Sequence, residues 1–477
     1  MRLLISVLLL IGSAVPSGAQ RQWIDVQSTH FNVLTDASEK QARDLAQQFE
    51  QMRSVFAQIS STQVKQLAPL QIIAFKNSRQ ISQYAPVYQG RPVKTSGFYL
   101  QSQDRDYIVL DLDAPNRWET VFHEFAHLLL AGTMPEMPPW FTEGFAEFYS
   151  TIQIDNKMAT IGRAPLSALE LLHHELLMPV TTLFSVDHGS PVYNSDSDPR
   201  DIFYAESWLV VHYLWDHNAM PQAQRYFQLV RQHVSIPEAV KQAFDMDPEQ
   251  FDRALEKYSR SAVEVLRVHL PEALEHASFS SRPVTRLESL TVLAGLHSHQ
   301  PEYVDQAIKE FKAILEQDPA NASAHRDLGY IYYYQHNTEA AMPQLRKAAE
   351  QNPEDWRVHY FWAEMAAQKN DDALAPQIES EARKVVELYP DFADGYGLLG
   401  FALMVEHRIA EAADAYQAAL RLKPQSEVYA LNLAELYSLE GKLDDAKELF
   451  LYLQDSGNAG IANAARSHLE LMASPKL

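Results

Sequence analysis

Two histidines four residues apart, in the run His123-Glu-Phe-Ala-His127, have the type and spacing that a metal site requires. On an α-helix, such residues differ by only about 40° around the axis and about 6 Å along it. Both imidazoles therefore reach one point, where a Zn²⁺ ion can take a nitrogen from each. A catalytic zinc also needs a third protein ligand and one position open to water. The next carboxylates along the chain, Glu143 and Glu147, are the candidates, and the spacing alone leaves the choice between them open.

Two helices must position these residues. Asn116 is suited to begin the first helix and Gly132 to end it. Pro139 is suited to the first turn of a second helix, which carries both glutamates one turn apart on one face. The proline-rich link between the helices lets the second fold back on the first, as a third ligand requires. Apolar residues recur at helical spacing in both segments, at Val121, Phe122, Phe125, Leu128 and Leu129 and then at Trp140, Phe141, Gly144, Phe145 and Phe148.

The histidine motif followed by Trp140-Phe-Thr-Glu-Gly-Phe-Ala-Glu-Phe148 resembles the gluzincin metallopeptidases. It is most similar to the bacterial peptidase MA-like group, which is often joined to tetratricopeptide repeats. The resemblance implies that zinc is held by two histidines and one glutamate, with a second glutamate as general base, and these are His123, His127, Glu143 and, as the base, Glu124. It also implies that Glu147 orients a zinc-binding imidazole. The alternative for Glu147 is an acid exposed to solvent.

Tyr204 is the candidate for stabilising the transition state. It begins a predicted helix, Tyr204–Leu214, after a loop rich in Gly, Pro and Ser at Asp187–Pro199. In aminopeptidase-like gluzincins a tyrosine at such a position donates a hydrogen bond to the oxyanion, and the resemblance implies the same for Tyr204. The alternative is an aromatic core residue. His188 and His212 are weaker candidates, because a lone histidine is more often structural.

The N-terminal residues 1–19 have the pattern of a secretory signal, with Arg2, an apolar run from Leu3 to Ile11, and small residues up to Ala19. No later stretch is apolar enough to span a bilayer. We therefore expect an exported protein, periplasmic or extracellular, with no membrane insertion after removal of the signal. The sequence contains no cysteine, so its stability must come from packing. The net charge of −22 argues against nucleic acid as a partner.

The expected fold class is α+β. Residues 20–270 are predicted to form a zincin-like catalytic domain, with a small antiparallel sheet before the zinc helix and mostly helices after it. The sheet is expected from a strand at His30–Thr35, a second at Pro69–Phe75 and a hairpin of Gly97–Gln101 with Tyr107–Leu112. A long helix at Ala37–Ile59 and a closing helix pair within Pro237–Tyr258 complete it. The resemblance implies that an exposed edge strand pairs with the substrate backbone.

After a predicted linker at 271–287, a repeat dominates the chain. Prolines at 319, 353, 390 and 424 are spaced by 34, 37 and 34 residues, and small and large apolar residues recur between them. This is the tetratricopeptide pattern, in which small residues let two helices of each repeat pack closely. We expect an all-α solenoid of about five repeats within 288–477, including an insertion at Asn370–Pro376 and a terminal capping helix at Ala459–Met472. It should offer a groove for a protein or peptide partner.

Together these features predict an exported zinc metallopeptidase that acts on peptides or proteins and carries a binding solenoid. A different class remains as the alternative, namely a scaffold in which the repeats perform the function and the zinc domain is vestigial. The presence of Glu124 favours the enzyme, because a scaffold does not need a general base.

Overall fold

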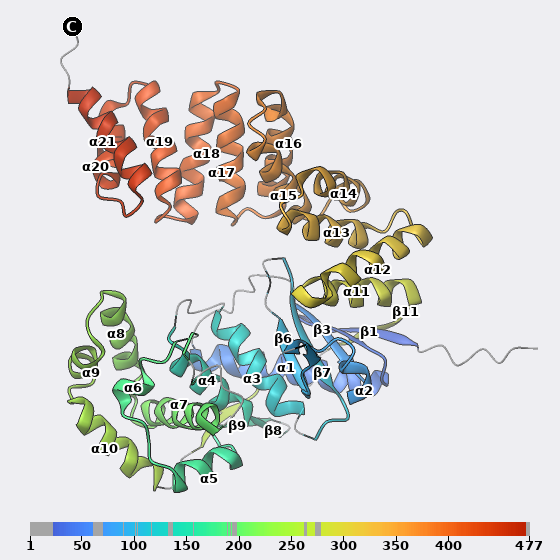
Figure 1. The fold of residues 1–477 in the computed structure, drawn as a ribbon, viewed down its shortest axis with the longest axis vertical. Coiled ribbons are helices and arrows are strands. Elements are labelled where there is room, and N and C mark those ends of the chain that lie inside the picture. Colours follow the sequence, from blue (N-terminus) through green and yellow to red (C-terminus); the bar gives the residue numbers. More distant parts are fainter. Residues whose placement is uncertain are drawn as a thin grey trace, which may run out of the picture. The chain divides into compact units, whose positions relative to one another are not determined.

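The computed structural model describes residues 22–60, 70–88, 90–100, 102, 104–115, 117–131, 137–155, 157–187, 189–190, 192, 198–261, 265–271 and 278–473. The chain divides into two compact units, residues 1–289 and 290–477 (Figure 1). The predicted signal at 1–19, the proposed cap Asn116 and the proposed helix end Gly132 lie outside the described residues. Among the described helices, none is both long and apolar enough to cross a membrane.

A six-stranded sheet organises the first unit, with the order β11-β1-β2-β3-β7-β6. Its strands are β1 (Trp23–Gln27), β2 (Asn32–Thr35), β3 (Leu70–Phe75), β6 (Gly97–Leu100), β7 (Asp106–Asp111) and β11 (Ser280–Val284). The predicted hairpin is confirmed, because β6 and β7 pair antiparallel. The expectation of a wholly antiparallel sheet was wrong, since β2 pairs parallel with β3, and β3 with β7. The long helix α1 (Glu39–Ser60) follows β2 and precedes β3, and such a crossover returns the chain in the same direction.

The rest of the first unit is mostly helical. Its remaining elements are α2 (Ser78–Ile81), β4 (Val87–Tyr88), β5 (Arg91–Pro92), α3 (Arg117–Ala131), α4 (Pro139–Ser150), β8 (Gln153–Asp155), β9 (Met158–Ile161), α5 (Leu166–His174), α6 (Val180–Leu183), α7 (Asp198–Asp216), α8 (Met220–Arg231), α9 (Ile236–Phe244), α10 (Pro248–Ser259) and β10 (Leu266–His269). The two helices predicted to carry the metal ligands are present as α3 and α4. The closing pair is present as α9 and α10.

Aromatic side chains fix α3 and α4 in the core of this unit. On α3, the ring of Phe125 lies 5.0 Å from that of Phe49 on α1, between ring centroids. On α4, the fully buried Trp140 stacks on Phe184 at 4.2 Å. Burial of each such side chain contributes roughly 1.5–3 kcal/mol, so the two helices are held mainly by the hydrophobic effect.

The predicted linker contains a strand of the first unit. Residues 280–284 form β11, which pairs antiparallel with β1 along its whole length. Just before β11, the Phe279 carbonyl accepts a hydrogen bond from the Arg43 side chain at 3.0 Å. Helix α11 begins two residues after β11, and the boundary between the units falls inside that helix. The sequence pattern did not predict this strand, because Ser280-Ser-Arg-Pro-Val284 has four exposed residues and no apolar alternation.

The pairing of β11 with β1 predicts which fragment of the first unit is the more stable. A fragment ending at Pro271 keeps the pairing of β1 with β2 but lacks β11, whereas one ending at Ser289 keeps both neighbours of β1. The shorter fragment should lose about 2–5 kcal/mol of unfolding free energy, because several backbone hydrogen bonds are each worth about 0.5–1.5 kcal/mol. Urea unfolding of the two fragments, followed by circular dichroism, measures the difference. Equal midpoints would show that β11 does not stabilise the sheet.

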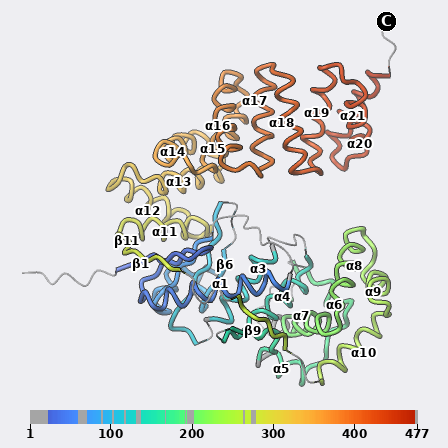
Figure 2. Tube along the Cα trace, turned by 180° about the vertical axis from the view of Figure 1, so that it is seen from behind, coloured from blue at the N-terminus to red at the C-terminus, as the bar shows by residue number. Residues whose placement is uncertain are grey.

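The second unit is an all-helical solenoid, as the repeat predicted (Figure 2). Its helices succeed one another in pairs, and a final helix packs on the last pair. They are α11 (Arg286–Ser298), α12 (Val304–Gln317), α13 (Ala322–Tyr334), α14 (Thr338–Gln351), α15 (Trp356–Gln368), α16 (Ala375–Leu388), α17 (Ala393–Val405), α18 (Ile409–Leu422), α19 (Glu427–Leu439), α20 (Leu443–Leu453) and α21 (Ala459–Ala473). A short 3₁₀ turn, η2 (Pro301–Tyr303), precedes α12, and another, η3 (Asp372–Leu374), lies in the insertion of the third repeat.

Small residues allow the helices of a pair to pack closely, as expected. A Cβ atom on Gly329 of α13 would lie 2.7 Å from the Leu345 side chain of α14, and one on Gly400 of α17 would lie 2.8 Å from Tyr416 of α18. No larger residue would fit at either position without moving its neighbour.

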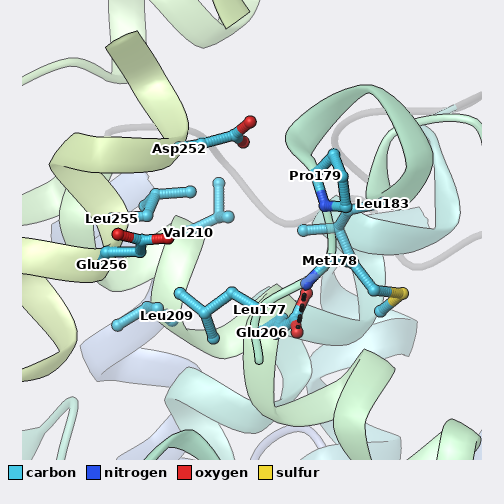
Figure 3. Close-up of a pocket in the computed structure, with 10 residues that line it drawn as sticks. All are labelled: Leu177, Met178, Pro179, Leu183, Glu206, Leu209, Val210, Asp252, Leu255 and Glu256. Carbon is cyan, nitrogen blue, oxygen red and sulfur yellow. Dashed lines mark hydrogen bonds between the residues drawn. The ribbon is translucent and has the colours of Figure 1, made fainter. Parts of the chain in front are cut away.

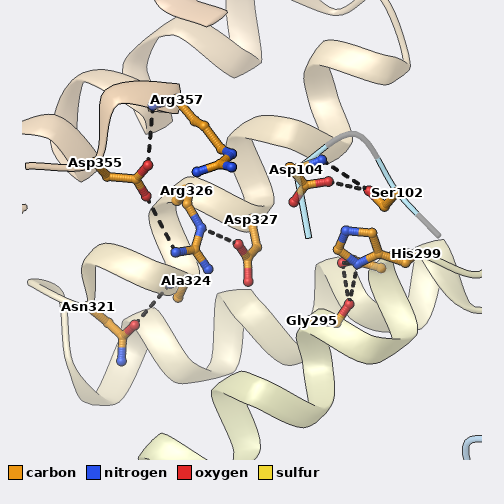
Figure 4. A network of polar contacts seen from close by, with 11 residues as sticks. Ser102, Asp104, Gly295, His299, Asn321, Ala324, Arg326, Asp327, Asp355 and Arg357 are labelled. Carbon is orange, nitrogen blue, oxygen red and sulfur yellow. Dashed lines mark hydrogen bonds and ion pairs between the residues drawn. The ribbon is translucent and has the colours of Figure 1, made fainter. Parts of the chain in front are cut away.

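Polar contacts define where the repeat helices begin (Figure 4). The Asn321 side chain accepts the backbone N–H of Ala324 and so caps α13. The Asp355 carboxylate accepts the N–H of Arg357 at the start of α15. The same carboxylate lies 3.5 Å from the guanidinium of Arg326, which also pairs with its neighbour Asp327 at 2.6 Å. The cap of α15 is thereby tied to α13 of the preceding repeat.

Candidate metal centre

Three potential metal ligands meet between α3 and α4. The Nε2 atoms of His123 and His127 lie 3.2 Å apart. The Glu143 Oε2 atom lies 3.4 Å from the first and 3.3 Å from the second. Ligand atoms of a tetrahedral zinc site, with bonds of about 2.0–2.1 Å, lie about 3.3–3.4 Å from one another. The residues present therefore fit zinc in the type and the spacing of their donor atoms.

Glu147 lies on the far side of the His123 ring. Its Oε1 atom is 3.2 Å from His123 Nδ1, while Nε2 of the same ring faces His127 and Glu143. A carboxylate on the outer nitrogen of a metal-binding imidazole fixes the ring orientation and its tautomer. The structure thus separates the two glutamates that spacing alone could not, with Glu143 inside the donor triangle and Glu147 behind one histidine.

The charges of the site are mutually stabilising. Burial acts to lower the pKa of His123, but the carboxylates of Glu143 and Glu147 outweigh it and raise that pKa to about 10. Burial acts to raise the pKa of Glu143, but both imidazoles hold it below its usual range. The Glu143 side chain is only 4 % exposed, so an ionised carboxylate sits in a largely dehydrated place. Such a carboxylate needs a cation or several hydrogen-bond donors beside it.

Glu124 faces the region of strand β6. It is half-buried on α3, and its charge, after burial and Asp106, contributes to raising the pKa of Tyr99 on β6. The start of β6 is tied to α3 by a 2.9 Å contact between the hydroxyls of Ser96 and Thr120. Among the described strands, β6 pairs with β7 alone and forms one edge of the sheet. The sequence did not show which strand lies at the edge of the sheet. The structure identifies β6 as the edge strand on the side of the proposed base, Glu124.

Tyr204 lies beside the candidate ligands, but not at the start of its helix. Its ring centroid is 6.1 Å from that of His123, with 33° between the planes. The predicted helix start was wrong, because α7 begins at Asp198, six residues earlier. Its Pro199 had suggested a loop, yet proline fits the first turn of a helix. Tyr204 therefore reaches the site from the second turn of α7.

Of the two weaker histidine candidates, the structure describes only His212, which lies apart from this site. His212 is buried, with its Nδ1 atom 2.7 Å from the Tyr258 hydroxyl and its ring against Phe148. The Tyr258 hydroxyl also donates to Asp216, so this group joins α7 to α10. His212 is therefore a structural residue, and His188 lies outside the described residues.

Sequence reasoning missed the importance of Gly144. A Cβ atom at this position would lie 2.1 Å from the backbone oxygen of Ser207 on α7. Helices α4 and α7 thus approach backbone to backbone, which only glycine permits. Gly144 directly follows Glu143, and Ser207 lies three residues after Tyr204. The contact therefore sets the distance between α4 and α7, the helices that carry Glu143 and Tyr204. The signal in the sequence was a glycine inside an apolar helix, which costs stability unless packing requires it.

The glutamates of α4 should differ in their effect on metal affinity. Glu143→Gln replaces a carboxylate of the donor triangle with a neutral amide and should reduce zinc affinity by far more than 100-fold. Glu147→Gln keeps the triangle and should cost about 10–100-fold, as expected for a residue that orients a ligand. Competition with a fluorescent zinc chelator measures both constants. The reverse order would assign the ligand role to Glu147.

A separate carboxyl group is buried on the other side of α7. Glu206 is 3 % exposed and lines a cavity of about 140 Å³ with Asp252 of α10 (Figure 3). Burial raises the pKa of Glu206 to about 8. The N–H of Met178, which donates to this carboxyl group at 2.8 Å, acts to lower that pKa but is outweighed. Asp252 similarly accepts the N–H of Val180. The two carboxyl groups anchor the start of α6 and the residue two positions before it, and they are not part of the metal centre.

Comparisons with known proteins bear on the second unit. Residues 304–364 match the tetratricopeptide repeat family. The human protein O-mannosyl-transferase TMTC1 is 28 % identical over 145 residues, which cover 30 % of this chain and 16 % of that protein. The Caenorhabditis elegans tetratricopeptide repeat protein 8 is 28 % identical over 169 residues, covering 34 % of this chain and 32 % of that protein. The chain thus spans no more than about a third of either relative.

Two solved structures align with part of this chain at low sequence identity. The protein MamA is 19 % identical and aligns over 38 % of this chain and 96 % of its own, with a TM-score of 0.29. YrrB, described as a tetratricopeptide repeat protein with an unusual peptide-binding site, is 18 % identical and aligns over 37 % of this chain and 90 % of its own, with a TM-score of 0.34. The family match, together with the helix pairs described above, shows that the C-terminal region of this chain consists of tetratricopeptide repeats.

Proposed function

We propose that the first unit is a zinc-dependent peptidase of the gluzincin type. The observation that carries this proposal is the triangle of His123 Nε2, His127 Nε2 and Glu143 Oε2, with sides of 3.2–3.4 Å. Glu124 lies in the same helix between the two histidines, so the ligands and a base come together on α3 and α4.

The residues of the site divide the chemistry among them. Zinc, when bound, acidifies a water molecule and polarises the scissile carbonyl. Glu124 takes the proton of the attacking water and passes it to the leaving amine. Tyr204 donates its hydroxyl hydrogen to the oxygen that becomes negative. Glu147 holds the His123 ring, and the edge of β6 that no described strand occupies offers backbone groups with which an extended peptide can pair.

The tetratricopeptide repeats are proposed to bind a protein or peptide partner. The competing proposal is a scaffold in which this binding is the whole function. It is favoured by the family match, which falls on the repeats. The peptidase is favoured by the complete set of ligands together with a base, because binding by the repeats uses none of them.

Metal analysis and a peptidase assay on the full chain test the proposed function. Purified protein should contain about one zinc per chain and cleave a peptide library, and a chelator should abolish cleavage until zinc is restored. His123→Ala should lose both metal and activity. Protein that carries zinc but cleaves no member of the library would favour the scaffold. Export is tested by sequencing the N-terminus of the mature protein, which should begin at Gln20.

Removal of one hydroxyl tests the proposed oxyanion donor. Tyr204→Phe keeps the ring beside His123 and should lower kcat by about 10²–10³-fold with little change in KM. Steady-state kinetics on a cleaved peptide measures the change. Tyr213→Phe, which alters a buried tyrosine on the same helix, serves as the control. Unchanged kcat in Tyr204→Phe would leave this tyrosine a packing role only.

A further inference from the structure

A large apolar cavity lies behind α4, away from the metal centre. Its volume is about 410 Å³, and the side chains of Phe141, Phe145 and Tyr149 form one wall. These residues follow one another at intervals of four, on one face of the helix. Glu143 and Glu147 are each offset from them by two positions, or about 200° around the axis, and so lie on the opposite face. The cavity and the donor triangle are therefore two separate places on one helix.

The cavity has the size and lining of a small-molecule site. Pockets of about 300–1,000 Å³ with apolar and aromatic walls are typical of such sites, and an apolar cavity of about 150 Å³ already binds benzene. The other walls come from α1, α3, α7 and α8, through Phe56, Leu130, Trp215 and Phe227 among others. Asn218 and Gln224 are exposed and give the cavity a polar rim.

One polar group in this wall, the Tyr149 hydroxyl, has no hydrogen-bond partner among the described residues. Tyr149 is 1 % exposed, yet no described residue forms a hydrogen bond with its hydroxyl. Burial raises the pKa of this phenol above its ordinary value, so the hydroxyl keeps its proton and can donate it. A hydroxyl that borders the cavity can donate to an acceptor placed there, and one such hydrogen bond contributes about 0.5–1.5 kcal/mol.

The charge of the lining restricts the ligand further. None of the described lining residues is charged, so a charged group inside the cavity would stay unpaired, at high cost. We propose that this cavity binds an uncharged molecule with an apolar body of about two rings and one hydrogen-bond acceptor, which receives the hydrogen of the Tyr149 hydroxyl. This site is independent of the proposed peptidase function, because no metal ligand or proposed base lines it.

Two probes of the same shape test the proposal by calorimetric titration of the full chain. Benzophenone has two rings and a carbonyl acceptor, and diphenylmethane has the two rings alone. Both should bind with a stoichiometry of one, and benzophenone should bind about 2- to 10-fold more tightly because of one added hydrogen bond. In Tyr149→Phe this preference should disappear while diphenylmethane affinity is kept. Tyr226→Phe, a buried tyrosine outside the cavity, should keep the preference.

A substitution that fills the cavity tests the location. Met220→Trp places a larger side chain in the lining and should weaken both probes more than about 10-fold, since their space is removed. Gln224→Trp at the exposed rim serves if Met220→Trp does not fold, as judged by its melting curve. Binding that survives occlusion, or no saturable binding of either probe, would show that the cavity is not a site. A preference for benzophenone that survives Tyr149→Phe would overturn the proposed recognition by the hydroxyl.

Discussion

Glu124→Gln should abolish peptide hydrolysis while leaving the zinc content and the fold unchanged. The substituted amide has the shape of the carboxyl group but cannot accept a proton from water. Loss of a general base lowers rates by about 10²–10⁴-fold, which would bring a modest peptidase below detection. The effect should appear in kcat more than in KM, because proton transfer occurs in the transition state. The assay must be accompanied by metal analysis and a melting curve of the variant.

A matched control is available in the same helix. Glu119 lies in the first turn of α3, exposed, and Glu119→Gln makes the same chemical change away from the donor triangle. It should keep full activity. If Glu124→Gln cleaves peptides as fast as the unchanged protein, the activity comes from a contaminating protease, and the scaffold becomes the better proposal for this chain.

Gly144→Ala should be the most destabilising single change at the centre. The new methyl group would lie 2.1 Å from the Ser207 oxygen, and a backbone atom cannot move aside as a flexible side chain can. Overpacking typically costs about 1–3 kcal/mol and more when the backbone must shift, so we expect about 3 kcal/mol or more. Helix α4 would be forced away from α7, and zinc affinity should fall together with stability. Urea unfolding and zinc competition measure the two effects.

A second glycine separates this contact from a general effect of alanine. Gly189, also in the first unit, has only one neighbour among the described residues, at 3.5 Å from a Cβ placed there, and it has no left-handed backbone angle. Gly189→Ala should change the unfolding free energy by less than about 0.5 kcal/mol. If Gly144→Ala melts as the unchanged protein does and keeps its zinc affinity, the backbone contact between α4 and α7 is not present in solution.

Local patterns predicted the parts of the centre that depend on one helix. The four-residue spacing of His123 and His127 requires only that α3 be helical, and Pro139 marked the start of α4 because it cannot continue a preceding helix. The repeat was equally readable, since each tetratricopeptide unit packs on its neighbour in sequence. These features are local, so composition and spacing determine them.

Features that depend on distant segments were not predicted. The direction in which β3 pairs with β2 follows from how α1 crosses the sheet, and no residue of the strands encodes it. The role of Gly144 depends on Ser207, which lies on another helix. Strand β11 has an exposed, polar sequence, and it forms because β1 presents an edge to it. In each case the structural role of the residue depends on a segment that is distant in the sequence, so the local pattern cannot predict it.

The pairing of β1 with β11 has a consequence for how the chain is made. Trp23 pairs with Val284, so the two ends of the first unit meet in neighbouring strands. During synthesis, β1 emerges early and its outer edge stays open until about residue 284 has followed. Contacts between residues so far apart in sequence form slowly, because a long loop must close first. Both helices of the metal centre are complete well before that point, so closing the sheet should be a late step in the folding of this unit.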